Sequence, residues 1–483
     1  MKKLRNILPT SITYQVKGSI EMEISGFKSD SRKVKAGEVF VALKGYTVDG
    51  HKFIPEVLQK GIRVVLCETF PDDEYSDVCF IRTEKIQPVL ADMLNAFYDY
   101  PSENISLVGI TGTNGKTTVA SQLYQLYENL GYKVGLISTI ENRIHHKVIS
   151  STHTTPDIIS LYELLNEMIL TNCSHAFMEV SSHSVIQERI MGLRFSGAVF
   201  TNLTHDHLDF HGTFKNYIEA KKKFFDNLPK MAFALINVDD VHGLVMIQNT
   251  KARTYTYSIN QLADFRMKVI SNNFEGLHLK YKDQDWHSRL IGEFNAYNLT
   301  AVLATASIMG EDEYELMKGL SDLHSVEGRF DWFYDEKSKK IGVIDYAHTP
   351  DALKKILENL RKIRHKNQRI ITVVGCGGNR DKSKRSEMAK IAVLASDHLI
   401  LTSDNPRDED PEEILKDMEM GISNEMNSSY IKIADREQAI KVACTLAKEN
   451  DIILVAGKGH EKYQEIRGKK LPFDDKKILK KNL

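Results

Sequence analysis

The chain has 483 residues, which is too long for one hydrophobic core and is typical of about three domains. Its 64 Lys and Arg residues balance 65 Asp and Glu residues, so no overall positive field is available to attract nucleic acid or an anionic membrane. With 42% hydrophobic and 27% charged residues, the composition is that of a globular protein.

The N-terminal segment contains short apolar runs separated by turn residues, such as "GEVFVALKG" and "GIRVVLCE". These runs predict a small α/β domain over residues 1–102. The opening "MKKLRNILPTSITYQV" is basic, but Pro9 and Thr10 interrupt any apolar stretch, which argues against a signal peptide. No apolar run in the chain approaches the roughly 18 residues of a membrane span.

The cysteines are scattered, odd in number and form no CxxC motif: Cys67, Cys79, Cys173, Cys376 and Cys444. This usage predicts buried free thiols in a reducing compartment rather than disulfides. We therefore expect a cytoplasmic protein that binds small molecules, with neither nucleic acid nor a membrane as partner, and we expect a monomer.

A second segment, over residues 103–330, alternates strand and helix patterns. The run "NISLVGI" leads into a glycine-rich loop, after which Val119, Leu123, Leu126 and Leu130 recur with the spacing of one helix face. Further apolar runs follow as "KVGLIS", "HAFMEV", "GAVFTNL" and "FALINV". The alternation predicts a parallel sheet covered on both faces by helices, and the glycine-rich loop within it indicates a central mononucleotide-binding ATPase domain.

The loop "GITGTNGKTT" departs from the standard phosphate-binding motif G-x-x-x-x-G-K-[ST]. Counting back from Gly115, the motif requires a glycine where the chain has Ile110. The order of strand, glycine loop and helix is still that of a phosphate site, where backbone amides face phosphate oxygens. Lys116 would reach the β- and γ-phosphates and the Thr117 hydroxyl would bind Mg²⁺; the alternative is an ordinary glycine-rich turn.

Acidic and imidazole groups follow two other strands of this segment. Glu179 stands at the end of the run "HAFMEV", one residue before its final valine, and one carboxylate with Thr117 and the phosphates would satisfy the preference of Mg²⁺ for oxygen ligands. A turn rich in histidine is more often stabilised by hydrogen bonds than used to bind a metal. The spacing does not favour His207 over the other polar members of the turn, which are His205, Asp206, Asp209 and His211. By pattern alone, "YIEAKKKFF" (Tyr217 to Phe225) is an amphipathic helix with a solvated lysine face.

Past Arg329 the alternation begins again. Apolar runs "KIGVIDYA", "RIITVVGCGG", "HLILTSDNP" and "DIILVAGKG" end in polar or glycine-rich turns, with amphipathic helices at 352–363 and 411–422 between them. Residues 331–483 are therefore predicted to form a Rossmann-like α/β domain, with its ligand at the carboxyl ends of the strands.

Three of these turns carry candidate binding groups: Arg380, Asn405, Arg407, Gly457 and Glu461. Guanidinium groups bind carboxylates through two parallel hydrogen bonds, and the Glu461 carboxylate suits an ammonium group. The set predicts a pocket for a zwitterionic amino acid with a second carboxylate. The alternative is that Arg407 pairs on the surface with an acidic residue at 408–410.

The motifs occur in an order that resembles the Mur ligases. The likeness runs from "SDSRKVKAGEVFVALKGYTVDGHKF" to "GKGHE" and so covers essentially the whole chain. Between them stand "GITGTNGKTT", "MEVSSHSVIQERI", "FTNLTHDHLDFHGT", "YIEAKKKFF", "GEFNAYNLTA", "VEGRFDWF", "DYAHTPDAL", "GCGGNRDKSKR" and "DNPRDEDP". The resemblance identifies "GTNGKTT" as this family's own ATP loop.

The resemblance, which is closest to members that add diaminopimelate, implies ATP-dependent amide synthesis in bacterial cell-wall assembly. The D-glutamate carboxylate of UDP-N-acetylmuramoyl-L-alanyl-D-glutamate would attack the γ-phosphate of ATP. An amine of meso-2,6-diaminopimelate would then displace phosphate from the acyl phosphate. ATP is thus the implied co-substrate and Mg²⁺ the implied cofactor.

The resemblance also assigns roles to residues. ATP would contact Gly112, Thr113, Asn114, Gly115, Lys116, Thr117, Thr118, Asn298, Arg329 and Asp345. The UDP-muramoyl peptide would contact Ser29, Ser31, Tyr46, Thr47, Val48, Thr154, Thr155, Ser181, Gln187 and Arg189. Diaminopimelate would contact Arg380, Asp404, Asn405, Pro406, Arg407, Gly457 and Glu461.

The implied metal ligands are Thr117, Glu179, His207 and an N-carboxylated Lys221, and the implied catalytic residues are Lys116, Lys221, His207 and Glu179. The chain departs from the family pattern in small ways, such as Asn379 where an aspartate is usual before the arginine.

Three alternatives remain. A lysine-adding relative generally lacks the arginine at position 407, and a folylpolyglutamate synthase-like ligase lacks the N-terminal module. A GTPase would need an N-K-x-D run, which the sequence does not contain.

Overall fold

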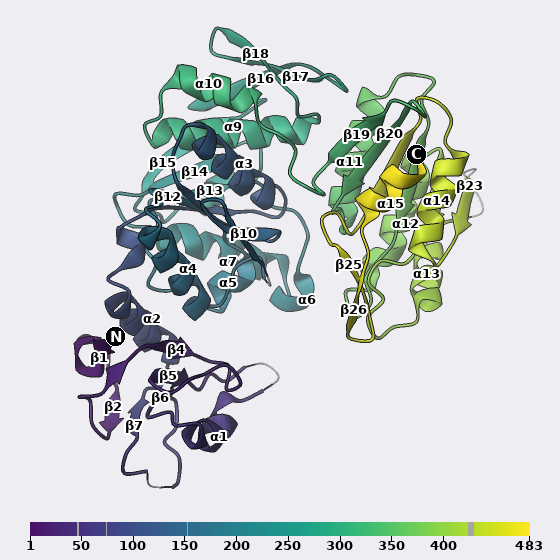
Figure 1. Cartoon of the computed structure of the whole chain (residues 1–483). Coiled ribbons are helices and arrows are strands. Elements are labelled where there is room, and N and C mark those ends of the chain that lie inside the picture. The colour runs from purple at the N-terminus through teal and green to yellow at the C-terminus, as the bar shows by residue number, and fades with distance from the viewer. Residues whose placement is uncertain (46–47, 74, 152, 424–428) are drawn as a thin grey trace.

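The computed structural model describes residues 1–45, 48–73, 75–151, 153–423 and 429–483. Three main sheets follow one another along the chain, and Figure 1 shows them as three α/β lobes, the N-terminal one in purple and the C-terminal one in green and yellow. Within the described ranges, no helix combines the length and the apolar character needed to cross a bilayer. The domain boundaries at 102 and 330 stay predictions.

The N-terminal lobe has a five-stranded sheet in the order β2-β7-β6-β5-β4, parallel except for β2. Its elements are β1 (Lys2–Lys3), β2 (Gln15–Lys17), β3 (Glu23–Ile24), β4 (Gly26–Lys28), β5 (Glu38–Val41), α1 (Ile54–Gln59), β6 (Val64–Cys67), β7 (Cys79–Arg82) and α2 (Ile86–Phe97). Val89 and Met93 of α2 share one apolar cluster with Ile159 and Tyr162 of helix α4 (Ile158–Leu170). This shared core joins the lobe to the central one.

The central sheet is parallel in its middle, in the order β9-β12-β8-β13-β14-β15. These strands are β8 (Ser106–Thr111), β9 (Val134–Ile137), β12 (His175–Glu179), β13 (Gly197–Phe200), β14 (Phe233–Asn237) and β15 (Arg253–Ser258). Most of their residues are buried, as expected for strands covered on both faces.

Helices cover both faces of this sheet. On one face lie α3 (Lys116–Asn129), α9 (Glu293–Ile308) and α10 (Glu313–Ser321). On the other lie α4, α5 (Ser182–Ile186), α7 (Phe214–Asp226) and α8 (Gly243–Met246), with the short α6 (Leu208–His211) beside α7. The predicted arrangement is therefore confirmed.

Further strands that the sequence patterns do not predict extend both edges of the central sheet. The hairpin of β10 (Glu141–Ile144) and β11 (Lys147–Ser150) adds to β9. At the other edge, β16 (Phe265–Asn273), β17 (Gly276–Tyr281) and β18 (Gln284–Ser288) continue beyond β15. The sheet is therefore mixed at its edges.

The C-terminal lobe has a six-stranded sheet in the order β19-β20-β24-β21-β22-β23, parallel except for β19. Its strands are β19 (Asp331–Asp335), β20 (Lys340–Asp345), β21 (Ile370–Val374), β22 (His398–Leu401), β23 (Ser429–Lys432) and β24 (Ile452–Ala456), with the hairpin β25 (Tyr463–Ile466) and β26 (Lys469–Pro472). Its helices are α11 (Pro350–Ile363), α12 (Ser383–Ala395), α13 (Pro411–Glu419), α14 (Arg436–Leu446) and α15 (Asp475–Asn482). The doubly covered sheet agrees with the predicted Rossmann-like class.

Candidate active site

The glycine loop lies between strand β8 and helix α3. Gly112 and Gly115 have φ angles of +149° and +88°, which residues other than glycine rarely adopt. A Cβ atom at Gly112 would lie 1.9 Å from Thr201 Oγ1, and one at Gly115 would lie 2.7 Å from Asn298 Oδ1. Packing therefore requires both glycines, although Gly112 stands where the standard motif has none.

The segment after strand β13 holds the loop in place. Asn202 Oδ1 accepts a hydrogen bond from the Asn114 amide at 3.0 Å, and its carbonyl accepts one from the Thr113 amide at 2.8 Å. The Thr201 hydroxyl donates to the Asn114 carbonyl at 2.6 Å. Because these two amides are used within the protein, the amides from 115 to 118, at the start of α3, are those left for a phosphate.

Two lysine side chains point at loop carbonyls. Lys116 Nζ donates to the carbonyls of Gly112 and Thr113 at 2.9 and 2.8 Å. Lys221 Nζ donates to the same Gly112 carbonyl at 2.8 Å and lies 4.8 Å from the centroid of the Tyr217 ring. Within the part of the chain that the structure describes, neither lysine forms an ion pair. The loop thus brings together two lysine amines that contact backbone carbonyls rather than carboxylates.

Burial governs the protonation of both lysines. It lowers the pKa of Lys116, against the opposing charges of Glu179 and Asp206. Burial and the neighbouring charge of Lys116 together lower the pKa of Lys221 well below its ordinary value. A solvated lysine face is therefore wrong for Lys221, which is 1% exposed.

Glu179 offers a ligand atom for a divalent cation. Its side chain is fully buried, and Oε1 accepts a hydrogen bond from the Thr139 amide at 2.7 Å. Oε2 has no hydrogen-bond partner among the described residues. Leaving a buried carboxylate oxygen unpaired is costly, and a Mg²⁺ ion would satisfy it. The residues present therefore fit the implied metal, with the buried Thr117 hydroxyl as a further oxygen.

The structure distinguishes the histidines that the sequence left equivalent. His211 Nε2 lies 2.9 Å from the Ser182 hydroxyl, and the His205 ring stacks on Phe214 with 4.4 Å between centroids. Both contacts are typical of structural histidines. His207 has a left-handed backbone, with φ of +53°.

Lys116 and Lys221 lie close enough to His207 to influence its pKa. Its Nε2 is 3.4 Å from Asp206 Oδ2. Burial lowers the pKa of His207; Asp206 opposes the shift, and Lys116 and Lys221 reinforce it. A neutral imidazole is the form that binds a metal.

The predicted muramoyl-peptide residues of the central lobe gather around Glu179. The Thr155 hydroxyl donates to the Glu179 carbonyl at 2.8 Å and accepts from the Ser181 amide at 3.2 Å. Arg189 Nη1 donates to the Thr155 carbonyl at 2.6 Å, and the hydroxyls of Thr139 and Thr154 are 3.0 Å apart. Gln187 follows directly on helix α5.

The predicted uridine-side residues lie in the N-terminal lobe. Ser29 and Ser31 follow strand β4, and the Ser31 carbonyl accepts a hydrogen bond from Lys60 at 2.9 Å. Val48 is 52% exposed. Tyr46 and Thr47 lie outside the described residues. Among the residues that the structure describes, no hydrogen bond or ion pair joins this group to the loop, so its role stays a prediction.

Arg329 and Asp345 connect the C-terminal lobe with the loop. Arg329 Nη2 donates to Thr117 Oγ1 at 3.2 Å, and its guanidinium lies 4.5 Å from the Tyr346 ring centroid. Asp345 Oδ2 accepts a hydrogen bond from the Phe330 amide at 2.6 Å. Burial raises the pKa of Asp345 to about 6, although the Arg329 charge opposes the shift.

Turns after strands β22 and β24 carry the residues that the sequence predicts for the amino-acid pocket. Asn405 Nδ2 donates to Glu461 Oε2 at 2.8 Å. The buried Lys458 donates to Asn405 Oδ1 at 3.0 Å and to Glu461 Oε2 at 3.1 Å. A Cβ atom at Gly457 would lie 2.6 Å from Asp404 Oδ2. The structure thus brings together four of the predicted pocket residues.

Arg407 points into this region rather than along the surface. Its Nε lies 3.4 Å from Glu465 Oε2, and Nη1 donates to the Gly378 carbonyl at 2.7 Å. Glu409, a neighbour in sequence, instead pairs with Arg385 at 2.9 Å. The surface-pairing alternative is therefore wrong.

The side chains of Arg380 and Arg407 both approach the turn at Gly377. A Cβ atom at Gly377 would be 3.0 Å from Arg407 Nη1 and 3.8 Å from Arg380 Cγ. The Pro406 carbonyl would be 1.9 Å from a Cβ at Gly378, so the two turns are in close contact. The Arg407 guanidinium and the aliphatic part of the exposed Arg380 side chain therefore flank one glycine turn.

Sequence reasoning missed residues that complete these sites. Lys458 could have been found, because it stands inside "GKGHE" three residues before Glu461. Lys221 was not missed, since the resemblance assigned it, but the pattern could have given its burial too, because it falls on the buried stripe of its helix with Tyr217, Phe224 and Phe225. Glu465 gives no such signal, since it is 58 positions from Arg407 and meets it only through the fold.

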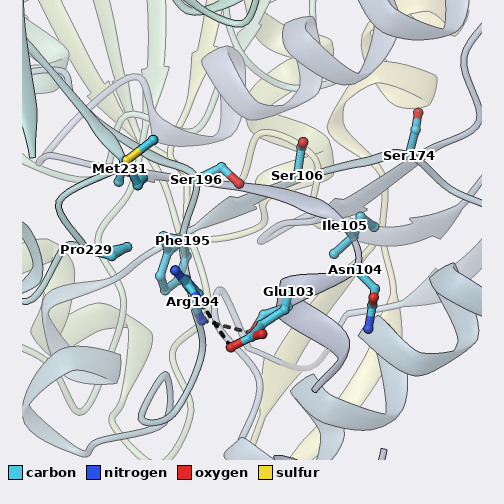
Figure 2. Close-up of a pocket in the computed structure, with 12 residues that line it drawn as sticks. Glu103, Asn104, Ile105, Ser106, Ser174, Arg194, Phe195, Ser196, Pro229 and Met231 are labelled. Atoms are coloured by element: carbon cyan, nitrogen blue, oxygen red, sulfur yellow. Dashed lines mark hydrogen bonds and ion pairs between the residues drawn. The ribbon is translucent and has the colours of Figure 1, made fainter. Parts of the chain in front are cut away.

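A hollow at the other end of the central strands is not part of this site. It is lined by residues next to the starts of β8, β13 and β14, including Ser106, Ser196 and Ala232, and Figure 2 shows Arg194 beside Glu103 at its rim. Arg194 Nη1 and Glu103 Oε1 are 3.3 Å apart. Ligands of parallel α/β sheets bind at the carboxyl ends of the strands, where the glycine loop lies.

Comparison with known proteins agrees with this arrangement. Residues 23–98 match the profile described as Mur ligase family, catalytic domain, residues 110–306 match the Mur ligase middle domain, and residues 328–459 match the Mur ligase glutamate ligase domain. A relative from Cytophaga hutchinsonii, named UDP-N-acetylmuramoyl-L-alanyl-D-glutamate–2,6-diaminopimelate ligase, is 52% identical over 97% of this chain and 96% of its own length.

Solved structures are similar as well. A structure with the same ligase name is 33% identical, covers 95% of this chain and 94% of its own, and superposes with a TM-score of 0.67. The MurF ligase of Thermotoga maritima in complex with ADP covers 89% of this chain and 93% of its own, with 21% identity and a TM-score of 0.64, which shows the fold alone. The chain belongs to the Mur ligase family, ATP-dependent enzymes that form amide bonds.

Proposed function

We propose that the chain adds meso-2,6-diaminopimelate to the D-glutamate carboxylate of UDP-N-acetylmuramoyl-L-alanyl-D-glutamate, a step of peptidoglycan precursor synthesis. The names of the relatives that match nearly the whole chain support this reaction. The observation that carries it is the arrangement at the loop. Among the described residues, the amines of Lys116 and Lys221 form no ion pair and one carboxylate oxygen of Glu179 has no hydrogen-bond partner, an arrangement that suits a polyphosphate with a divalent cation.

The reaction has two steps because a carboxylate is a poor electrophile. A carboxylate oxygen of the dipeptide attacks the γ-phosphorus of ATP, the bond to ADP breaks, and an acyl phosphate forms. The diaminopimelate nitrogen then attacks the acyl carbon, phosphate leaves with the electron pair of the C–O bond, and the nitrogen loses a proton. Lys116 and the amides from 115 to 118 would stabilise the charge that develops on the departing ADP.

Mg²⁺ would be held by Thr117 and Glu179, with His207 and Lys221 for a second ion. When bound, it would neutralise charge on the phosphate oxygens. An ammonium group cannot bind a cation, so Lys221 would serve as its carbamate, formed when the amine attacks CO₂ and releases a proton. The lowered pKa of Lys221 supports this role, because only the neutral amine reacts.

The amino-acid pocket would hold the two ends of diaminopimelate differently. Glu461 and Asn405 suit an ammonium group, whereas Arg380 and Arg407 suit carboxylates. Because lysine lacks the distal carboxylate, it leaves one guanidinium without a ligand. The pocket therefore favours diaminopimelate over lysine.

The other candidates receive less support. The match of residues 23–98 to a Mur ligase profile argues against a folylpolyglutamate synthase-like enzyme, which lacks that module. The remaining competitor is a lysine-adding ligase, and Arg407 argues against it. The substrates are small molecules and include ATP, so we place the reaction in the cytoplasm and keep a monomer as the expected state.

Phosphate release tests the proposed function. With ATP and Mg²⁺, release should require both the UDP-muramoyl dipeptide and diaminopimelate, and a product longer by one residue should appear by mass spectrometry. Lysine in place of diaminopimelate should give little release. Equal rates with the two amino acids would overturn the specificity, and no ADP with all reactants present would overturn the function.

The carbamate has a separate test. Lys221→Ala should lose at least about 100-fold in rate, because a positioned charged group is lost from the metal site. A short carboxylic acid added to the assay should restore part of the activity. The matched control is Lys223→Ala on the exposed side of the same helix, which should stay at the wild-type rate. Absence of rescue together with normal folding would contradict the carbamate.

A further inference from the structure

Two adjacent histidines form the tip of the β10–β11 hairpin beside helix α3. Ile144 pairs with Lys147, so His145 and His146 are the two loop residues. The Tyr124 hydroxyl of α3 donates to the His145 carbonyl at 2.9 Å, which holds the tip against the helix. Glu128 stands one helical turn beyond Tyr124 and faces the same tip.

The three side chains converge with the spacing of metal ligands. Glu128 Oε1 is 3.2 Å from His146 Nδ1 and 3.9 Å from His145 Nδ1. One ligand atom from each residue lies within 4.8 Å of the others. Ligands of a tetrahedral zinc ion at 2.0–2.2 Å are separated by about 3.3 Å. An adjustment of roughly 1 Å would therefore bring the set into a coordination sphere.

Two of these atoms are buried without a hydrogen bond. Neither Glu128 Oε1 nor His145 Nδ1 has a hydrogen-bond partner among the described residues. The nearby cations are engaged elsewhere, because Arg143 pairs with Glu141 at 2.5 Å and Lys147 pairs with Glu167. Buried polar atoms normally have partners, so this pair points to a ligand that binds both.

We propose that Glu128, His145 and His146 bind a divalent transition-metal ion of the zinc class, with water in the fourth position. Imidazole ligands suit zinc, copper or nickel, whereas Mg²⁺ prefers oxygen. This site is separate from the glycine loop and is not needed for the reaction. The ion clamps the hairpin tip to α3, the helix that begins at the loop with Lys116.

Titration of the full-length protein with Zn²⁺ tests the site, with excess Mg²⁺ and ADP present to occupy the loop. Wild type should bind one more equivalent of Zn²⁺ than His146→Ala or Glu128→Gln, or bind it at least about tenfold more tightly. His146 is 78% exposed in its side chain, so its replacement should not disturb folding. His365→Ala, an exposed histidine of the C-terminal lobe, is the control and should match wild type.

A second readout follows the clamp directly. Zn²⁺ should slow amide hydrogen exchange at 141–150 in wild type and in the control, but not in His146→Ala. Ligase activity without Zn²⁺ should be the same in His146→Ala and wild type. Identical Zn²⁺ titrations for wild type and both site variants would overturn the proposal. His278 and His287 form a stacked pair elsewhere in the chain. The proposal would also be overturned if His278→Ala alone lost the additional equivalent of Zn²⁺.

Discussion

The glycine loop and the amino-acid pocket both lie at the carboxyl ends of parallel strands, yet they treat charge in opposite ways. At the loop, Lys116 and Lys221 rest on backbone carbonyls, and one oxygen of Glu179 has no partner. In the pocket, Lys458 pairs with Glu461 and Arg407 pairs with Glu465. Among the described residues, the two loop lysines have no ion-pair partner, whereas the cationic side chains Lys458 and Arg407 of the pocket each have one.

The difference bears on affinity and specificity. A polyphosphate at the loop would give the Lys116 amine an ion-pair partner without displacing one that it already has. An amino acid in the pocket replaces internal ion pairs, and its net gain is the difference between two sets of contacts. Such an exchange discriminates between ligands more than it adds affinity.

The largest expected effect comes from removing a loop cation. Lys116→Met should lower the rate of phosphate release by about 10³-fold, because a donor aimed at the developing charge is lost. The ligand-free variant should be at least as stable to thermal unfolding as wild type, since the substitution removes a partly buried amine that has no ion-pair partner among the described residues.

The control for this prediction is Lys223→Met, which lies on an exposed face. A marked loss of stability in Lys116→Met would mean that the lysine is structural. The contrast between loop and pocket would then fail.

The sequence predicts much of the loop and less of the pocket. Strand, glycines and helix are local features, so Gly112, Lys116 and Thr117 could be assigned before the structure. Lys221 was readable from its position on the buried stripe of α7, although the surrounding lysines suggested a solvated face.

The pocket depends on contacts that no local pattern specifies. Glu465 reaches Arg407 because strand β25 forms a bridge between Ile466 and Arg407. Strands near the two margins of the central sheet, such as β10 and β16, were missed for a similar reason, since their pairing is decided by neighbours rather than by their own periodicity. Long-range pairing is thus the part that sequence reasoning could not supply.

The next largest effect is expected in the pH dependence of the free energy of unfolding, at Asp345 of strand β20. The folded pKa of Asp345 is raised from 3.8 to about 6 by burial, so the folded state holds this proton more tightly than the unfolded state. Its stabilising contribution is complete below pH 3.8 and is lost as the pH rises through 6. The full change amounts to about 3 kcal/mol.

Asp345→Asn carries no charge at any pH, so it isolates this contribution. The free energy of unfolding of the variant minus that of wild type should rise by up to about 3 kcal/mol between pH 4 and pH 7, measured by chemical denaturation. Parallel pH profiles for the two proteins would show that Asp345 is not a proton-binding group of the folded state.

A smaller, selective effect is expected in the pocket. Arg407→Lys keeps the charge but loses the planar fork, so the KM for diaminopimelate should rise about 10- to 100-fold. The KM for ATP should stay within about twofold, because the loop is untouched. Steady-state kinetics with each substrate varied in turn would measure both.

L-Lysine provides the sharper control for Arg407→Lys. Since lysine has no distal carboxylate, its weak turnover should change much less than that of diaminopimelate. A rise confined to the KM for ATP would mean that Arg407 does not bind the amino acid, and the loop and the pocket would then not differ in the way proposed.

The smallest effect is expected where the glycine loop contacts helix α11 of the C-terminal lobe. Asn114 Nδ2 donates to Asp351 Oδ2 at 3.3 Å, which joins the loop to the first turn of α11, and Asp351 also pairs with Lys355 at 3.0 Å. Asp351 is partly exposed, so Asp351→Ala should cost less than about 1 kcal/mol and raise the KM for ATP less than about fivefold, with kcat unchanged. Asp351→Asn keeps an acceptor and should lie closer to wild type. A rise of more than tenfold in the KM for ATP of Asp351→Ala would mean that the C-terminal lobe is needed to order the glycine loop. The contacts of the loop with Thr201 and Asn202 would then be insufficient to hold it.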